Sequence, residues 1–182
     1  MPLEIERRFL VTGDGWRQHI RSQDSLRQGY LMADQQGTVL RVRISQSEFP
    51  SGEASMPRAW LTLKATPPSG GVSSAESLSR LEFDYAIPHQ DGIELLALSS
   101  HQLSKIRYGL DLRDGDWVVD VFDAANAPLV VAEVELLHPD QIVSIPPWCS
   151  AEVSGRHELS NAALAARPLQ QWSAAERASV GL

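Results

Sequence analysis

The chain has 182 residues, of which 43% are hydrophobic and 21% are charged, and its formal net charge is -7. This length suits one well-buried domain, and the acidic excess argues against a general nucleic-acid surface, which depends on surplus Lys and Arg. The sequence contains no run of about 18 apolar residues and no basic-then-apolar leader, so we expect no membrane span, no secretory signal and a cytoplasmic location. With Cys149 as its single cysteine, the chain cannot form an intrachain disulfide or a thiolate metal cluster.

The first predicted strand, residues 4–11, carries two carboxylates and a guanidinium on one face. Side chains alternate between the faces of a strand, so Glu4, Glu6 and Arg8 point the same way. Like charges two residues apart repel each other, and a divalent cation between the two carboxylates would stabilise the strand. A solvated face with a Glu–Arg ion pair is the alternative interpretation of this stretch.

The rest of the chain predicts seven further strands, most of them joined by short turns. They span residues 27–32, 39–45, 59–66, 78–88, 103–112, 117–123 and 129–137. Short helices are predicted around residues 16–21, 91–100 and 161–166, and the Pro-, Gly- and Ser-rich stretch 67–77 predicts a loop. We therefore predict a mainly β protein of the α+β class, in which residues 1–182 form one domain with a core over about 3–166 and a C-terminal helical tail over 167–182.

Same-face charges recur along these strands, and their signs segregate by strand. Arg41 shares a face with Arg43, Lys105 with Arg107, and Glu133 with Glu135, whereas the face with Arg80, Glu82 and Asp84 mixes signs. The solvated face of an open sheet would carry mixed signs within each strand. A closed eight-stranded antiparallel β-barrel would instead enclose acidic and basic walls, which are costly to desolvate unless a polyanion and its divalent metal fill the lumen.

A series of short motifs runs through nearly the whole chain. They are Glu4-Ile5-Glu6-Arg7-Arg8, Gln28-Gly29-Tyr30-Leu31, Leu40-Arg41-Val42-Arg43, Leu61-Thr62-Leu63-Lys64, Arg80-Leu81-Glu82-Phe83, Lys105-Ile106-Arg107-Tyr108, Asp120-Val121-Phe122, Val131-Ala132-Glu133-Val134-Glu135, Glu152-Val153-Ser154 and Ser160-Asn161. In order and spacing they resemble the CYTH, or triphosphate tunnel metalloenzyme, superfamily, whose opening signature is Glu-x-Glu-x-Lys. The likeness is closest to its small bacterial members.

This resemblance implies an eight-stranded tunnel with a few flanking helices, which binds a triphosphate lengthwise and hydrolyses a phosphoanhydride with Mg²⁺ or Mn²⁺. It implies metal ligation by Glu4, Glu6, Glu133 and Glu135, together with Glu82 and Asp120. It implies a substrate path lined by Arg8, Arg41, Arg43, Lys64, Arg80, Lys105 and Arg107. All-oxygen ligation suits a hard cation, and the basic residues would neutralise charge on the leaving oxygen.

The resemblance also implies catalytic positions at Arg8, Tyr30 and Lys64. A water that is bound to the metal or positioned by a carboxylate would be the nucleophile. Tyr30 would orient this water with residue 8, or alternatively would pack at the rim. The expected partner is therefore a small anionic triphosphate or polyphosphate, with no nucleic acid and no membrane, and a homodimer is left open.

Two places depart from the family pattern. Residue 8 is Arg where the signature has Lys, and a guanidinium does not readily give up a proton. Near the C-terminus, His157-Glu158-Leu159 stands where the small bacterial members carry a basic and aromatic stretch. Three functions stay open: an inorganic triphosphatase, a hydrolase or cyclase acting on an organic triphosphate such as a nucleotide or thiamine triphosphate, and a polyphosphate- or nucleotide-binding protein with little turnover.

Overall fold

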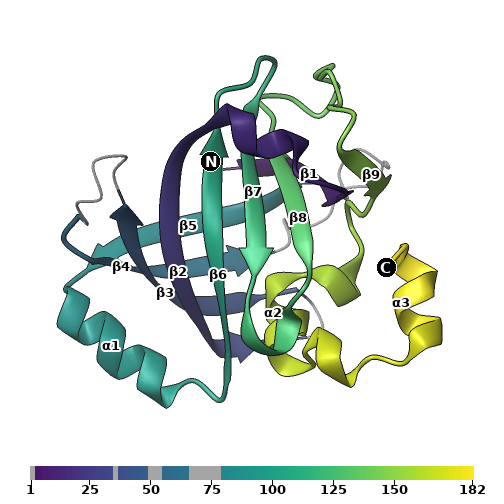
Figure 1. Ribbon diagram of the computed structural model, residues 1–182. Helices are drawn as coiled ribbons and strands as arrows, with labels where there is room; N and C mark the ends of the chain where they lie inside the picture. Colours follow the sequence, from purple (N-terminus) through teal and green to yellow (C-terminus); the bar gives the residue numbers. More distant parts are fainter. Residues whose placement is uncertain (1–2, 35–36, 49–54, 66–78) are drawn as a thin grey trace.

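The computed structural model describes residues 3–34, 37–48, 55–65 and 79–182, and they form mainly β structure (Figure 1). The strands are β1 (Leu3–Val11), β2 (Ile20–Ala33), β3 (Val39–Glu48), β4 (Arg58–Ala65), β5 (Ser79–Ile87), β6 (His101–Leu110), β7 (Asp116–Phe122), β8 (Val130–Glu135) and β9 (Cys149–Glu152). The helices are α1 (His89–Leu98), α2 (Asn161–Ala166) and α3 (Ala174–Val180), with 3₁₀ turns over Gly15–His19, Ala124–Asn126, His157–Leu159 and Leu169–Gln171. The prediction of a mainly β protein with a few helices is confirmed, whereas the predicted loop 67–77 lies outside the described residues.

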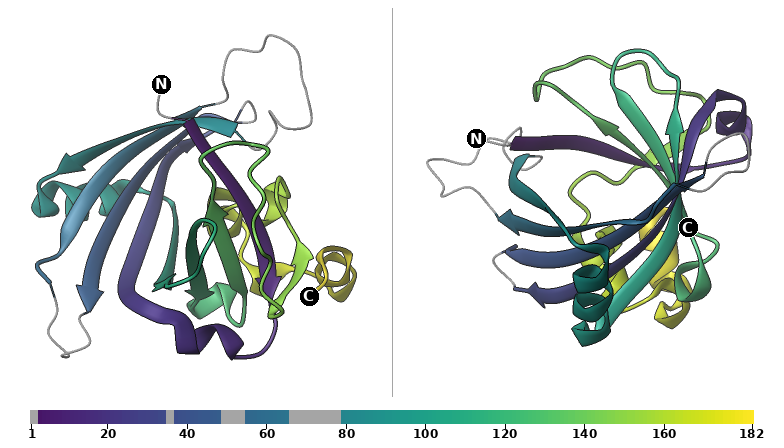
Figure 2. Two further views of the ribbon diagram at one scale, coloured as in Figure 1. Left: turned by 90° about the horizontal axis from the view of Figure 1, so that it is seen from above. Right: turned by 90° about the vertical axis from the view of Figure 1, so that its left-hand side faces the viewer.

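All nine strands belong to one antiparallel sheet with the order β5-β4-β3-β2-β6-β7-β8-β1-β9. Strand β1 pairs with β8 over Glu6–Leu10, and its first residues pair with β5, where Glu4 lies opposite Arg80. The sheet curves strongly, as the two further views show (Figure 2). Consequently one side of every strand faces inward toward the other strands, and the opposite side faces the helices, turns or solvent.

The eight predicted strands are all present, but β2 is longer than predicted. It begins at Ile20 rather than Arg27, because the polar segment around Gln23 and Asp24 pairs through its backbone with β3 and β6. The first half of β2 was not predicted because its sequence does not alternate between apolar and polar residues. The predicted helix over residues 16–21 is the 3₁₀ turn Gly15–His19, and α3 lies in the predicted C-terminal tail.

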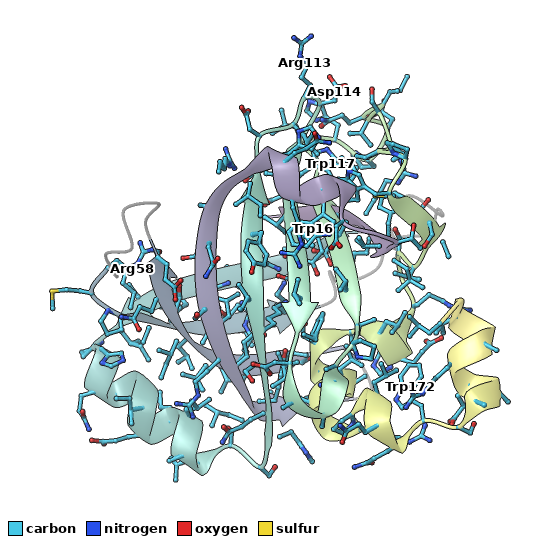
Figure 3. The ribbon with its side chains drawn as sticks, viewed as in Figure 1. Trp16, Arg58, Arg113, Asp114, Trp117 and Trp172 are labelled. Atoms are coloured by element: carbon cyan, nitrogen blue, oxygen red, sulfur yellow. The ribbon has the colours of Figure 1, made fainter. Side chains whose placement is uncertain are left out.

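Two apolar clusters stabilise the curved sheet. One contains Trp16, Trp117 and Trp148 and covers the outer face of β1, β6, β7 and β8. The other contains Phe122, Val131 and Trp172 and joins the opposite end of the sheet to the C-terminal helices. Figure 3 shows this separation, with Trp16 and Trp117 in the upper part and Trp172 among the C-terminal helices. Each large side chain buried this way contributes about 1.5–3 kcal/mol.

Close approach of α1 to the sheet explains a glycine in one of the sequence motifs. A Cβ atom at Gly29 would lie 2.2 Å from Ser99 Oγ and 2.8 Å from Leu96 Cδ1. Any larger residue at this outward-facing position of β2 would therefore push α1 away. Within the described residues, no helix has both the length and the apolar character needed to cross a membrane.

Candidate functional site

The strand registers bring the predicted charged residues to one face of the sheet. Residues directly opposite each other in an antiparallel pair share a face. Between β1 and β8, Glu6 lies opposite Glu135 and Arg8 lies opposite Glu133. Lys64 on β4 lies opposite Glu82 on β5, and Arg107 on β6 lies opposite Asp120 on β7. The face includes Glu4, Glu6, Arg8, Arg41, Arg43, Lys64, Glu82, Lys105, Arg107, Asp120, Glu133 and Glu135, and we call it the charged face. Arg80 lies opposite Glu4 by backbone register, but its side chain is outside the described part of the structure.

Arg8 links the charged face to the C-terminal segment. Its Nε donates to Glu133 at 3.1 Å, its Nη1 donates to the Leu159 carbonyl at 3.1 Å, and its Nη2 is buried without a hydrogen-bond partner among the described residues. Burial works to lower the pKa of Arg8, but the carboxylates of Glu133 and Glu6 outweigh it and raise that pKa. The residue that departs from the family signature is thus a fixed, permanent cation with one free donor.

A second group of cations centres on Asp120, which is fully buried. Lys105 Nζ donates to Asp120 at 2.5 Å and to the Asn161 amide oxygen at 3.1 Å, while Arg107 bonds both Asp120 and Glu133. Burial and then the charge of Arg107 lower the pKa of Lys105 to about 8, although Asp120 acts in the opposite direction. Both carboxylate oxygens of Asp120 accept from cations, and both oxygens of Glu133 do the same for Arg8 and Arg107, so either carboxylate would have to exchange these bonds to bind a metal.

Arg41 and Arg43 occupy neighbouring inward positions of β3. Arg41 Nη2 donates to Thr62 Oγ1 at 3.0 Å and lies 3.4 Å from Glu82, and Arg43 Nη2 donates to Asp84 at 3.0 Å. The Nε atoms of both arginines are buried and have no hydrogen-bond partner in the described structure. Burial, together with the nearby charge of Arg41, lowers the pKa of Arg43 to about 10.

Strand β1 contributes two carboxylates, of which Glu4 is ion-paired with a lysine and has a lowered pKa, whereas Glu6 has no ion pair with a described residue and has a raised pKa. Glu4 binds Lys64 Nζ at 2.5 Å, and this lysine overcomes the effect of burial and lowers the pKa of Glu4. Glu6 and Glu135 lie opposite each other and make no ion pair with a described residue. Burial and then the charges of Glu133 and Glu4 raise the pKa of Glu6 to about 7, and burial and Glu4 raise that of Glu135.

Glu6 and Glu135, which lie opposite each other without a basic partner among the described residues, form with Glu4 and Glu133 what we call the acidic region. Carboxylate oxygens are the donors that Mg²⁺ and Mn²⁺ prefer, so this donor set fits a divalent cation chemically. Among the described residues, however, no three Asp, Glu, His or Cys side chains converge closely enough to form a coordination group. The predicted ligands share one face, but ion pairs hold Glu4, Glu82, Asp120 and Glu133 to basic residues.

Tyr30 lies directly opposite Arg41, and it belongs to the apolar cluster that joins the sheet to the C-terminal helices. Its hydroxyl donates to the Gln28 side-chain oxygen at 3.1 Å, and burial raises the pKa of the phenol. The packing alternative for Tyr30 therefore has direct support in its contacts, and its expected role with a water molecule stays a prediction.

Three side chains that hydrogen-bond the predicted cationic groups, within the described residues, were not among the predicted site residues. Thr62 and Asp84 bond Arg41 and Arg43, and strand alternation with Lys64 and Glu82 was the signal that could have identified them. Asn161 belongs to the Ser160-Asn161 motif and bonds Lys105 from the start of α2, but the motif by itself does not indicate which residue it contacts. A hollow of about 690 Å³ beside Trp148 and Pro146 lies on the outside of the sheet and shares no residue with the charged face.

Comparison with known proteins gives both a sequence relative and structural neighbours. A curated inorganic triphosphatase of Acetivibrio thermocellus is 30% identical over 174 residues, which cover 94% of this chain and 99% of that protein. The crystal structure of the inorganic triphosphatase NE1496 is 29% identical, with a TM-score of 0.57 over 91% of this chain and 95% of its own. The PH1012 protein from Pyrococcus horikoshii OT3 shares the fold at 15% identity and a TM-score of 0.51, over 79% of this chain and 80% of that chain. No model of a protein family matches the sequence.

Proposed function

Because this chain belongs to the CYTH-type inorganic triphosphatases, we propose that its charged face binds inorganic triphosphate and hydrolyses one of its phosphoanhydride bonds. The protein is thus a hydrolase, and its substrate is a small linear polyanion. The charged face offers two basic walls, one with Arg41 and Arg43 on β3 and one with Lys105 and Arg107 on β6. Cations on both sides of a linear triphosphate can neutralise each of its phosphates.

The observation that carries this proposal is a set of three buried guanidinium donors with no partner in the described residues. They are Arg8 Nη2, Arg41 Nε and Arg43 Nε. A buried donor without an acceptor costs about 1–3 kcal/mol, and more when it is charged. Phosphate oxygens from one ligand would supply acceptors to all three guanidiniums, which lie on strands β1 and β3.

The charged face lines a closed tunnel in this proposal. Strand β1 pairs with β8 through one part of its length and with β5 through its first residues, which supports closure of eight strands into a ring. Leu169, Trp172 and Val180 pack into the apolar cluster that also contains Leu10, which supports treating residues 1–182 as one domain.

We place Mg²⁺ or Mn²⁺ at the acidic region, held by Glu4, Glu6, Glu133 and Glu135. Glu82 and Asp120 would orient basic residues there, as their ion pairs with Arg41 and Lys105 suggest. A divalent ion bound at these carboxylates would supply positive charge to the phosphate oxygens and favour attack by water. Because no metal-coordinating group is assembled among the described residues, binding requires the carboxylates to move closer together.

The chain's own residues would act by binding and by neutralising charge. Arg8 and Lys64 would hold the reacting phosphate. Arg107, which shares Glu133 with Arg8, would bind a neighbouring phosphate together with Lys105. The hydrolysis needs water as its nucleophile and releases phosphate and diphosphate. Stabilisation of charge on the leaving oxygen by preorganised cations is the dominant contribution expected for phosphoryl transfer.

Phosphate release from tripolyphosphate tests the proposal directly. The purified protein should release phosphate when Mg²⁺ or Mn²⁺ is present, and chelation should abolish the activity. Glu4→Gln and Glu135→Gln should each lower metal-dependent turnover by several orders of magnitude without unfolding the protein. No release with either metal across pH 7 to 10 would refute the hydrolase proposal, and full activity of both variants would refute the metal site.

A second candidate substrate is an organic triphosphate, because an aromatic ring lies on the charged face. Trp60 is directly opposite Arg43, and the guanidinium carbons of Arg43 and Arg58 lie 5.1 and 5.2 Å from its ring centroid. Such a cluster could stack on a planar base. If nucleoside triphosphates are better substrates than tripolyphosphate and Trp60→Leu removes that preference, this candidate replaces the first, and a cyclic nucleotide product would identify a cyclase.

A further inference from the structure

Thr62 occupies the centre of a hydrogen-bonded chain that connects two arginines of the charged face. Its side chain is completely buried, at 0% exposure. Its hydroxyl oxygen accepts from Arg41 Nη2 at 3.0 Å, and its hydroxyl group donates to Asp84 Oδ1. The other oxygen of Asp84 accepts from Arg43 Nη2 at 3.0 Å. The sequence of contacts is therefore Arg41, Thr62, Asp84 and Arg43, across strands β3, β4 and β5.

The two arginines need such a connection because they repel each other. They are two residues apart on the same face of β3, and the charge of Arg41 adds to burial in lowering the pKa of Arg43. Long side chains with this repulsion would separate unless both were held. Glu82 lies farther from Arg41, at 3.4 Å, and it also contacts Lys64 at 3.3 Å. Thr62 is thus the shorter contact of Arg41, and Asp84 is the ion-pair partner of Arg43.

The chemistry of a hydroxyl suits this position. It accepts one hydrogen bond and donates another, so it can serve a guanidinium and a carboxylate at once without adding charge. The contacts use the terminal Nη2 of each arginine and leave both Nε atoms buried and without partners in the described structure. Both Nε donors are therefore held in fixed places among the residues of the charged face.

We propose that Thr62 is a positioning residue that sets Arg41 and Arg43 for binding one end of the triphosphate. This inference rests on the proposed function and adds to it a residue that does not touch substrate. Removal of the hydroxyl would leave Arg41 and Asp84 each without a partner, so the two arginines would no longer present their Nε donors together. Substrate affinity would fall, whereas the reacting phosphate near Arg8 and Lys64 would be unaffected.

Three variants test this inference by steady-state hydrolysis of tripolyphosphate. Thr62→Val keeps nearly the same shape but lacks the hydroxyl, and we expect KM to rise roughly 10- to 100-fold with kcat changed by less than about threefold. Thr62→Ser keeps the hydroxyl and should restore KM to within about threefold of the original. The matched control is Thr12→Val, which removes a threonine hydroxyl that bonds the Trp148 carbonyl outside the charged face, and it should leave KM unchanged.

Two further measurements make each outcome decisive. In the Arg41→Gln background, Thr62→Val should raise KM by a smaller factor than it does in the original protein, because one of the two arginines that it positions is gone. Additive losses, an unchanged KM in Thr62→Val, or a fall in kcat alone would overturn the inference. If the original protein does not hydrolyse tripolyphosphate, the proposed function fails, and the calorimetric Kd for tripolyphosphate then replaces KM. Thr62→Val must still weaken that Kd at least about tenfold relative to Thr62→Ser, and equal values or no binding by any form would overturn the inference.

Discussion

At the scale of single residues, Arg8 shows how a departure from the family signature is accommodated. A lysine has one nitrogen at its tip, whereas this guanidinium reaches Glu133 with Nε and the Leu159 carbonyl with Nη1. The carbonyl belongs to the segment His157-Glu158-Leu159, which is the second departure. The two departures are thus in direct contact, because the C-terminal segment supplies a backbone acceptor to the guanidinium that also bonds Glu133.

We expect Arg8→Lys to lower the free energy of unfolding by about 1–2 kcal/mol, because one of these two buried contacts is lost. The pH profile of kcat should stay the same, since residue 8 binds phosphate in our proposal. Urea unfolding and kinetics from pH 7 to 10 measure both quantities. A higher kcat or a shifted pH profile would show instead that an amine at residue 8 handles a proton.

Arg7→Lys is the matched control for this substitution. Arg7 points to the other side of β1 and pairs with Glu152, whose side chain is 41% exposed. An exposed ion pair contributes at most about 1 kcal/mol, so the control should change stability less than Arg8→Lys does and should not change KM.

Glu6 should make the metal-free protein less stable as the pH rises. Its pKa in the folded protein is about 7, raised by burial and by Glu133 and Glu4, so the folded state holds a proton that the unfolded state releases near pH 4.5. This stabilisation is complete below the unfolded pKa and is lost as the pH rises through the folded pKa, by about 3.5 kcal/mol in all at about 1.4 kcal/mol per pKa unit.

The uncharged variant Glu6→Gln should not show this loss. With a chelator present, we expect it to be more stable than the original protein at pH 8, and we expect the difference to shrink toward pH 4. Urea unfolding at several pH values gives the comparison. A stability difference that does not vary with pH would contradict the raised pKa of Glu6.

At the scale of secondary-structure elements, Asn126 joins the C-terminal segment to the sheet. This buried side chain lies in the 3₁₀ turn between β7 and β8. Its amide nitrogen donates to the Leu164 carbonyl of α2, and its oxygen accepts from the Leu169 backbone N–H. One amide therefore satisfies two backbone groups that would otherwise be buried without partners.

We expect Asn126→Asp to lower the free energy of unfolding by about 2–4 kcal/mol, because it removes the donor to Leu164 and buries a carboxylate. The matched control is Gln141→Glu. That amide also bridges two backbone groups, Leu137 N–H and Asp114 C=O, but at the surface, so we expect a loss below about 1 kcal/mol. Thermal or urea unfolding of the two variants should differ clearly, and equal losses would remove the proposed role of Asn126 as a link.

At the scale of the whole molecule, the surplus carboxylates near Glu6 predict that divalent ions stabilise the fold. An ion present at about 100 times its Kd adds about 2.7 kcal/mol, which corresponds to a rise in Tm of about 5–10 °C for a chain of this size. The rise should be larger at pH 8 than at pH 6, because the metal competes with the proton on Glu6. Differential scanning calorimetry with Mg²⁺ or Mn²⁺ measures it.

Two controls separate metal binding from general screening of charge. Sodium chloride at matched ionic strength should not reproduce the rise in Tm, and Glu6→Gln should abolish it. A rise of equal size in the variant would place the ion elsewhere.

The sequence alone determined which residues of each strand share a face. Alternation along a strand is a local property of the extended backbone, so Glu4 with Glu6 and Arg41 with Arg43 could be grouped without knowing the fold. The eight strands followed from the same periodicity, and the order of the motifs identified the family. The polar first half of β2 was missed because backbone pairing with two neighbours, rather than buried side chains, holds it in the sheet.

Only the tertiary structure decided which acid contacts which base. Those contacts depend on strand register and on the curvature of the sheet, and both arise from pairing between residues far apart in the sequence. This packing produces three contacts that hold cations in place: the Leu159 carbonyl accepts from Arg8, the Asn161 amide oxygen accepts from Lys105, and the Thr62 hydroxyl accepts from Arg41. A neutral hydroxyl or a backbone carbonyl leaves no charge pattern in a sequence, and so the contacts of these groups with the cations became visible only when the strands were assembled.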